Sequence, residues 1–242
     1  MASIRTIVNL YKSNSVSLCG MRGRGKDMLM ANVILRRNEP YISNMNYGGD
    51  YIPLDFNKLD IGNDWRNFMS GKINVYNYPY PLKADIYISD SSVYMPNYEC
   101  QNLNRELKGF VPTNAIIRHL SEGGGIHYNT QCLTRMWDKI REQSDCYLRC
   151  DKCIYIGKYI KPLKLVIQKV TYYDKFASCE SNVKPFPKLG IFDMIKVDKL
   201  TYTLMKMSYT ATHGKILPMW LVYWNKSDYD THYFKTLLGG KI

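Results

Sequence analysis

Residues Leu18–Arg37 read LCGMRGRGKDMLMANVILRR, and this stretch decides the fold. An apolar strand-like segment leads into it, and an amphipathic helical segment, Met28–Arg36, leaves it. The turn between them holds three glycines and a lysine: Gly20, Gly23, Gly25 and Lys26. A strand, a glycine-rich turn and a helix in this order form a phosphate-binding loop. Backbone N–H groups of the turn and the helix N-terminus face the phosphates, and the lysine neutralises them.

One position of the loop departs from the usual pattern. The loop reads GMRGRGKD, with Asp27 where a Ser or Thr hydroxyl normally ligates Mg²⁺. A carboxylate also ligates Mg²⁺, but it adds negative charge where the loop needs positive charge. Arg22 and Arg24 lie inside the loop and offset that charge. We therefore assign Arg24 and Asp27 to the phosphate site together with the glycines and the lysine.

Length and charge limit which domain organisation and which partners are possible. A chain of 242 residues is long enough for one large α/β domain, alone or with an appendage. Its formal charge of +12 leaves two interpretations open. One is a lysine-rich composition with no charged partner, and the other is a polyanionic partner, either nucleic acid or an acidic membrane surface.

Cysteine usage and hydropathy predict a cytoplasmic protein. The seven cysteines are odd in number, and Met1–Leu10 lacks the apolar core of a secretory leader, which favours reduced thiols. No apolar run approaches the roughly 18–20 residues of a membrane span. The longest, Ile216–Trp224, contains Pro218 and is predicted to be a buried strand. Any membrane role therefore requires a partner.

Alternating helix and strand patterns over the first 145 residues predict an α/β fold with a mostly parallel, helix-flanked sheet. Ile4–Leu10 reads as a lead-in to the first strand, and most of Asn44–Pro81 as loops with a short helix at Trp65–Met69. The last hundred residues are richer in strand-forming residues than in helix signals. Further strands are predicted at Val16–Leu18, Tyr41–Ser43, Ala84–Asp90, Ile126–Gln131, Tyr147–Arg149, Cys153–Ile156, Leu163–Tyr173 and Leu217–Trp224; further helices at Asn97–Lys108 and Thr113–Ser121.

A second feature supports the loop. Ala84–Asp90, ADIYISD, is an apolar strand that ends in a carboxylate. In phosphate-binding-loop sites such an aspartate holds Mg²⁺ through water, and the metal offsets charge on the transferring phosphoryl group. The alternative is a strand that ends in Asp by chance. Ser91 stands where a catalytic glutamate would activate water, so nucleotide binding is the safer prediction than rapid hydrolysis.

A third feature lies further along the chain. Thr130-Gln131 comes at the end of a predicted strand, where a side chain can hydrogen-bond a γ-phosphate or the attacking water. Arg118-His119 precedes this strand, and Asp138–Arg141, DKIR, follows it.

The order of these motifs resembles the Zot family, named after the N-terminal domain of zonular occludens toxin. These proteins are the assembly ATPases of filamentous phages, within the wider FtsK–HerA group of DNA-pumping and packaging motors. The resemblance covers about residues 14–150. It implies a RecA-like P-loop NTPase domain over residues 1–150, followed by a β-rich C-terminal extension over residues 151–242. It also implies ATP and Mg²⁺ as ligands.

The resemblance assigns roles to individual residues. The loop glycines and Lys26 would bind the phosphates, and Asp27 and Asp90 would lie on the metal side. Gln131 would sense the γ-phosphate. Arg141, or alternatively Arg118, would reach the nucleotide of a neighbouring subunit; the competing interpretation for either arginine is a solvated or salt-bridged surface residue.

Weaker signals leave other sites open. Cys150 and Cys153 form a C-x-x-C, which Cys146 and Cys179 would complete as a zinc site, although the spacing is irregular. The alternative is a set of small, semi-buried thiols. Lysines interleaved with aromatic residues in the C-terminal third are the best candidates for a nucleic-acid face: Tyr172, Tyr173 and Phe176.

Three functions follow from these features. The first is an ATP-binding, ATP-hydrolysing motor for phage assembly, extrusion or DNA packaging. It would work as a homo-oligomeric ring on single-stranded or packaged phage DNA in the host bacterial cytoplasm, or peripherally at the inner membrane with an assembly partner. The second is a catalytically weak P-loop scaffold that binds DNA or a membrane assembly partner. The third, a nucleotide kinase, lacks a lid-like arginine cluster.

Overall fold

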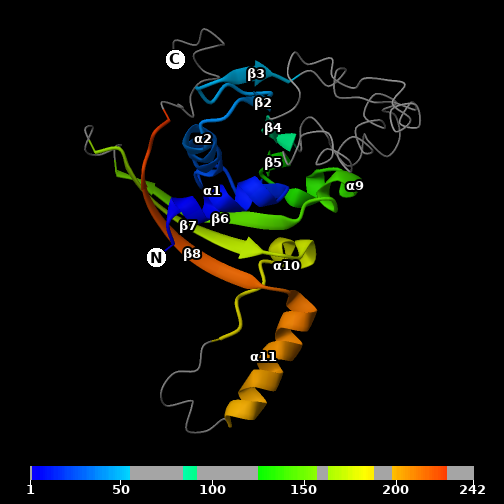
Figure 1. The fold of residues 1–242 in the computed structure, drawn as a ribbon. Coiled ribbons are helices and arrows are strands. Elements are labelled where there is room, and N and C mark those ends of the chain that lie inside the picture. Colours follow the sequence, from blue (N-terminus) through cyan, green and yellow to red (C-terminus); the bar gives the residue numbers. More distant parts are fainter. Residues whose placement is uncertain (1, 55–83, 92–124, 157–162, 188–197, 228–242) are drawn as a thin grey trace.

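The computed structural model describes residues 2–54, 84–91, 125–156, 163–187 and 198–227, and Figure 1 shows how they are arranged. Eight strands form one sheet in the order β3-β2-β4-β5-β1-β6-β7-β8. The strands are β1 (Val16–Cys19), β2 (Tyr41–Ser43), β3 (Tyr51–Pro53), β4 (Asp85–Ile88), β5 (Ile126–Thr130), β6 (Cys146–Tyr155), β7 (Leu165–Tyr173) and β8 (Ile216–Trp224). The helices are α1 (Ile4–Ser13), α2 (Lys26–Arg37), α9 (Asp138–Arg141), α10 (Phe176–Glu180) and α11 (Lys199–His213), with a 3-10 turn at Leu133–Arg135.

The sheet has a parallel part and an antiparallel part. Strands β3, β2, β4, β5, β1 and β6 are parallel, and β6, β7 and β8 pair antiparallel. One strand, β5, separates β1 from β4. The predicted α/β class with a mostly parallel sheet and a β-rich C-terminal part is confirmed. The expected junction between residues 150 and 151 falls inside β6, so β7 and β8 continue the same sheet.

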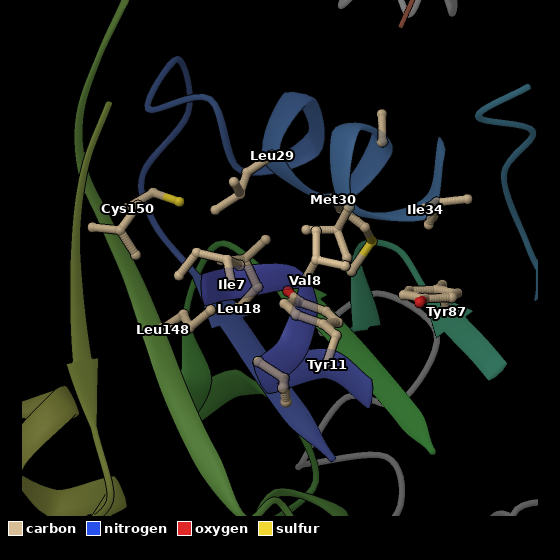
Figure 2. Close-up of a cluster of buried hydrophobic side chains, with 14 of the residues drawn as sticks. Ile7, Val8, Tyr11, Leu18, Leu29, Met30, Ile34, Tyr87, Leu148 and Cys150 are labelled. Carbon is tan, nitrogen blue, oxygen red and sulfur yellow. The ribbon is translucent and has the colours of Figure 1, made fainter. Parts of the chain in front are cut away.

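The main core lies between one face of the sheet and the helices α1 and α2. Figure 2 shows Ile7 and Tyr11 of α1 and Leu29 of α2 among side chains of the sheet such as Leu18 and Leu148. All five are at most 1% exposed. This packing fixes the start of α2 against the end of β1, which is where the glycine loop lies.

A buried polar network lies in the same layer. The Asp85 carboxylate accepts hydrogen bonds from the backbone N–H of Gly125 (3.0 Å) and from Nε2 of His127 (3.1 Å), and it pairs with Arg37. Nδ1 of His127 accepts from the backbone N–H of Val16 (3.3 Å), so the proton of the neutral ring resides on Nε2. Burial lowers the pKa of His127, whereas its hydrogen bond to Asp85 raises it; the net shift is downward.

Two sequence predictions about this architecture were wrong, and a third, most of Asn44–Pro81 as loops, left out a short strand. Ile4–Leu10 belongs to a helix, α1, which Ser3 caps by accepting from the backbone N–H of Arg5. The short strand β3 lies within the stretch predicted as loops. Strand β8 is not buried on both faces, because Trp220 and Trp224 are 43% and 57% exposed.

Helix α11 is a further element that the sequence patterns missed. Asp198 caps it by accepting from the backbone N–H groups of Leu200 and Thr201. The helix projects away from the sheet (Figure 1). It contains Leu, Met, Thr and Tyr in a mixed order, and Leu200, Leu204, Met205 and Met207 are all more than half exposed. Without a buried apolar stripe its helical periodicity is weak.

Some predictions fall outside the described residues: the helices at Trp65–Met69, Asn97–Lys108 and Thr113–Ser121, and the pair Arg118-His119. Within the part of the chain that the structure describes, no helix combines the length and apolar character needed to cross a membrane.

Candidate phosphate-binding site

The glycine loop connects the end of β1 to the start of α2, as the sequence predicts. Gly23 and Gly25 have φ values of 77° and 75°, which L side chains rarely adopt. A Cβ on Gly25 would lie 2.5 Å from Sγ of Cys153, and one on Gly20 would lie 2.9 Å from the carbonyl oxygen of Cys150. The loop therefore needs glycine at these positions to pass so close to β6.

The start of α2 is open toward the loop. Gly25 is its N-cap residue and forms no side-chain capping hydrogen bond. The first backbone bond of the helix runs from the N–H of Leu29 to the carbonyl of Gly25 (2.9 Å). The N–H groups before Leu29 thus lack a helical carbonyl partner, and together with the positive end of the helix dipole they suit an anion.

A buried glutamine supports the loop from β7. Nε2 of Gln168 donates to the carbonyl oxygens of Arg24 and Gly25, both at 3.1 Å, and its Oε1 accepts from the hydroxyl of Tyr223 (2.8 Å). Gln168 is fully buried. No motif in the sequence identified Gln168, and its strand also carries Lys169 and Thr171, so a polar residue there was not distinctive.

Lys26 is brought close to both predicted metal-side carboxylates. Its amine donates to Oδ2 of Asp27 at 3.1 Å and lies 4.0 Å from Oδ1 of Asp90. The lysine side chain is 7% exposed, whereas the carboxylates are 22% and 34% exposed. The Lys26 amine is therefore largely shielded from water. Two carboxylates lie near it: Asp27 at the start of α2 and Asp90 after β4.

Asp90 lies in the turn after β4, two residues beyond the strand. Its backbone has φ 48°, an unusual value for a non-glycine residue. Burial raises the pKa of its carboxyl, Lys26 opposes that shift, Asp27 adds to it and Arg22 opposes it; the net shift is upward. A raised pKa means that the ionised carboxylate lacks full charge compensation in this state.

Asn129 of β5 joins the site, although the sequence analysis did not name it. Its Nδ2 donates to Oδ1 of Asp27 at 2.5 Å and lies 3.4 Å from Oγ of Ser89. Its Oδ1 is buried and has no hydrogen-bond partner. An unpartnered buried acceptor costs about 1–3 kcal/mol, so this atom indicates a missing donor at the site. In the sequence, the signal for Asn129 was its position near a strand end, two residues before Gln131.

Gln131 lies beside the loop, whereas Arg141 does not contact it. Gln131 is exposed and lines a cavity of about 400 Å³ beside the loop, together with Gly20, Arg24 and Arg149. The guanidinium of Arg141 lies 4.0 Å from the ring centroid of Phe176 and donates to the carbonyl of Leu133 (3.4 Å). The described contacts of Arg141 are therefore within its own subunit and not with the loop.

Ser91, at the position where a catalytic glutamate would be expected, faces the interior. It is fully buried, and its hydroxyl donates to the carbonyl of Asn129 at 3.2 Å. Ser91 therefore supplies no carboxylate beside Asp90, and Asp27 is the other carboxylate that acts on it.

The residues at the site fit Mg²⁺ but the cysteines do not fit zinc. Mg²⁺ in nucleotide sites uses one or two carboxylates and otherwise water and phosphate, which matches Asp27 and Asp90. Across the described ranges, no three His, Cys, Asp or Glu side chains are grouped as metal ligands. Burial raises the pKa of Cys153 to about 11 and that of Cys146 to about 12. The zinc alternative for Cys146, Cys150, Cys153 and Cys179 finds no support here.

Comparison with known proteins gives only distant structural neighbours. No protein-family profile and no curated protein matches the sequence. The N-terminal domain of zonular occludens toxin from Neisseria meningitidis superposes with a TM-score of 0.43 at 15% identity, covering 78% of this chain and 97% of that one. The genome packaging NTPase B204 from Sulfolobus turreted icosahedral virus 2, in complex with ATP-gammaS, gives a TM-score of 0.39 at 17% identity, covering 67% and 93%. The Legionella pneumophila ATPase DotB gives 0.36 at 9% identity, covering 88% and 58%.

Proposed function

We propose that this chain binds ATP and Mg²⁺ at the Gly20–Asp27 loop and hydrolyses ATP as a motor on phage DNA. The observation that carries the proposal is the arrangement around Lys26. Its shielded amine lies at the uncapped start of α2, 3.1 Å from Asp27 and 4.0 Å from Asp90. An amine, a set of free N–H groups and two carboxylates are the components that hold a nucleotide triphosphate with its metal.

Each component has a distinct task in this proposal. The backbone N–H groups of the loop and Lys26 hold the β- and γ-phosphates, with Arg24 adding positive charge. Asp27 and Asp90 would hold the metal. When bound, Mg²⁺ neutralises charge on the phosphates. The Lys26 amine already pairs with Asp27, so an arriving phosphate competes with the Asp27 carboxylate for this amine. Asp27 therefore weakens phosphate binding.

Two residues are candidates for orienting the attacking water. Asn129 has a buried, unpartnered Oδ1 that can accept a hydrogen bond from water, close to Asp27. Gln131 lies on the neighbouring cavity wall, and we retain it as the γ-phosphate sensor that the motif order implies. Holding a water in line with the phosphorus is sufficient for this role, since phosphoryl transfer depends mainly on positioning and electrostatics.

The motor part of the proposal follows from the Zot-like order of motifs. It includes a homo-oligomeric ring in the host cytoplasm, single-stranded or packaged phage DNA as substrate, and an inner-membrane assembly partner. Arg141 packs on Phe176 in this subunit, so action on a neighbour's nucleotide would require it to leave that ring. Arg118 is the second candidate for that role.

A catalytically weak scaffold is the alternative, and one observation favours it. Ser91 is buried where a catalytic glutamate would be expected, with its hydroxyl on a backbone carbonyl. The experiment that separates the two functions measures ATP hydrolysis with DNA and Mg²⁺ present, using Lys26→Ala as control. Turnover above the control supports the motor. Binding of ATP without turnover supports the scaffold.

A further inference from the structure

The antiparallel part of the sheet has one covered face and one open face. On β7 and β8 the side chains of Val170, Leu221 and Tyr223 belong to the core cluster with residues of α1 and α2. Their sequence neighbours point to the other side. We call this side the open sheet face; it comprises Lys152 and Ile154 of β6, Ile167 and Lys169 of β7, and Trp220 and Trp224 of β8.

The register of the three strands places lysine and tryptophan side by side. Lys152 is directly opposite Lys169, and Lys169 is directly opposite Trp220. Like charges directly opposite each other on antiparallel strands destabilise the sheet. Within the described residues neither lysine forms an ion pair. The nearest carboxylate in sequence, Asp151, is engaged by Thr171 Oγ1 (2.6 Å) and Arg149 Nε (3.5 Å). The paired lysines therefore favour an anionic partner.

The tryptophans provide flat apolar surface beside this charge. Trp220 is 43% exposed and Trp224 is 57% exposed. They are separated by four residues on the same strand face, or about 13 Å at the usual rise of a strand. Aromatic faces next to positive charge are the elements that bind single-stranded nucleic acids, because any base can stack on them. A duplex keeps its bases stacked inside and offers no such contact.

We infer that the open sheet face binds single-stranded nucleic acid, with bases stacked on Trp220 and Trp224 and phosphates near Lys152 and Lys169. The excess positive charge of the chain, +12, agrees with a polyanionic partner. This inference deepens the proposed function and rests on its DNA partner. It locates binding on the β-rich C-terminal part rather than on the nucleotide loop. It also moves the nucleic-acid contact from Tyr173, which is buried, to the tryptophans.

The test is fluorescence anisotropy with a fluorescein-labelled oligo-dT of about 12 nucleotides, within the usual site size of such surfaces. We expect Trp220→Ala and Trp224→Ala each to weaken binding about tenfold. We expect Lys169→Gln to reduce the slope of log K against log salt by about 0.7, because one phosphate contact is lost. Lys206→Gln is the matched control, since it removes an exposed lysine on α11. It should leave the slope unchanged.

Several results would overturn the inference. Unchanged affinity in both tryptophan variants is one, and an equal slope change in Lys169→Gln and Lys206→Gln is another. Stronger binding to a duplex of the same length would also contradict it. If Trp224→Ala dissociates an oligomer in sedimentation velocity while oligo-dT binding is unchanged, the open face contacts a second copy instead. Melting curves of the variants confirm that each has folded.

The same samples separate this inference from the proposed function. A fluorescent ATP analogue is titrated into the wild type, Trp220→Ala and Lys26→Ala. A chain that binds oligo-dT through the tryptophans but does not bind ATP refutes the proposed function and leaves the inference standing. A chain that binds ATP through Lys26 but does not bind oligo-dT refutes the inference and leaves ATP binding by the proposed function standing.

Discussion

Replacing Asp27 tests how the loop handles its own negative charge. The Asp27 carboxylate lies 3.1 Å from the Lys26 amine, and both side chains are mostly shielded from water. Unit charges 4 Å apart interact by about 1 kcal/mol in water and about 4 kcal/mol at an effective dielectric constant of 20. A phosphate that has to displace Asp27 loses part of that energy, so we expect Asp27→Ser to favour binding by up to about 1–2 kcal/mol. The affinity of Asp27→Ser for the nucleotide should therefore be unchanged or higher, by at most roughly 5–30-fold.

The assay is a titration of a fluorescent ATP analogue at fixed Mg²⁺, repeated with EDTA. Asp27→Asn is the matched control, because it keeps the shape of the side chain and removes only the charge. Asp27 also lies in the first turn of α2, where a negative charge contributes about 0.3–1 kcal/mol to stability, so a slightly lower melting temperature is expected. A tenfold loss of affinity in Mg²⁺ that disappears with EDTA would refute the reasoning, because the contact of Asp27 with the metal would then outweigh its competition with the phosphate for Lys26.

Three further predictions concern the loop, the strand end and the buried network. Gly25→Ala should abolish ATP-analogue binding and lower the melting temperature, because its φ of 75° and a thiol 2.5 Å away leave no room for a Cβ; wild-type binding would contradict this. Asn129→Ala should lower kcat of any hydrolysis at least as much as Gln131→Ala, with little change in analogue affinity for either; the reverse order would favour the γ-phosphate role of Gln131. The free energy of unfolding should fall as pH drops below about 6.5, since the folded pKa of His127 is lowered and the unfolded chain then binds more protons. The folded pKa of Asp85 is also lowered, so its contribution is lost at still lower pH; urea unfolding across pH 2–8 checks both, and a flat profile in the wild type would contradict them.

The parallel part of the fold was predictable because its signals are local. The apolar run before Gly20, the glycine spacing and the helix that ends before Pro40 specify β1, the loop and α2. Asn38 closes that helix in a left-handed conformation, as expected ahead of a proline. Strand β4 is a short and mostly apolar run, buried over its whole length. Such runs are typical of a parallel sheet with both faces covered.

Among the elements that were missed or misread are α1, although its apolar residues recur at helical spacing, and β8. In α1 the core side chains Ile7, Val8 and Tyr11 cover one face, but a Ser-capped ten-residue segment before a strand was not recognised as a helix. Strand β8 reads as fully apolar, yet its position at the sheet edge leaves Trp220 and Trp224 exposed. Sequence hydropathy cannot distinguish a doubly covered strand from an edge strand with one apolar open face.

Site residues that belong to motifs along the chain could be predicted from the sequence. Site residues that the order of strands in the sheet brings to the loop could not. Lys26, Asp27 and Asp90 were named from motifs and lie together. Asn129 and Gln168 come from strands that only the sheet topology brings to the loop. Polar side chains within predicted strands were the one indication of these two site residues, and such side chains have many structural explanations.

The most direct test of the account is ATP turnover by the purified full chain, with Mg²⁺ and single-stranded DNA present, beside Lys26→Ala. The account predicts hydrolysis that DNA stimulates and that the lysine variant lacks, while both proteins show the same melting behaviour. Equal phosphate release from the two proteins, at the level of the blank, would contradict the motor.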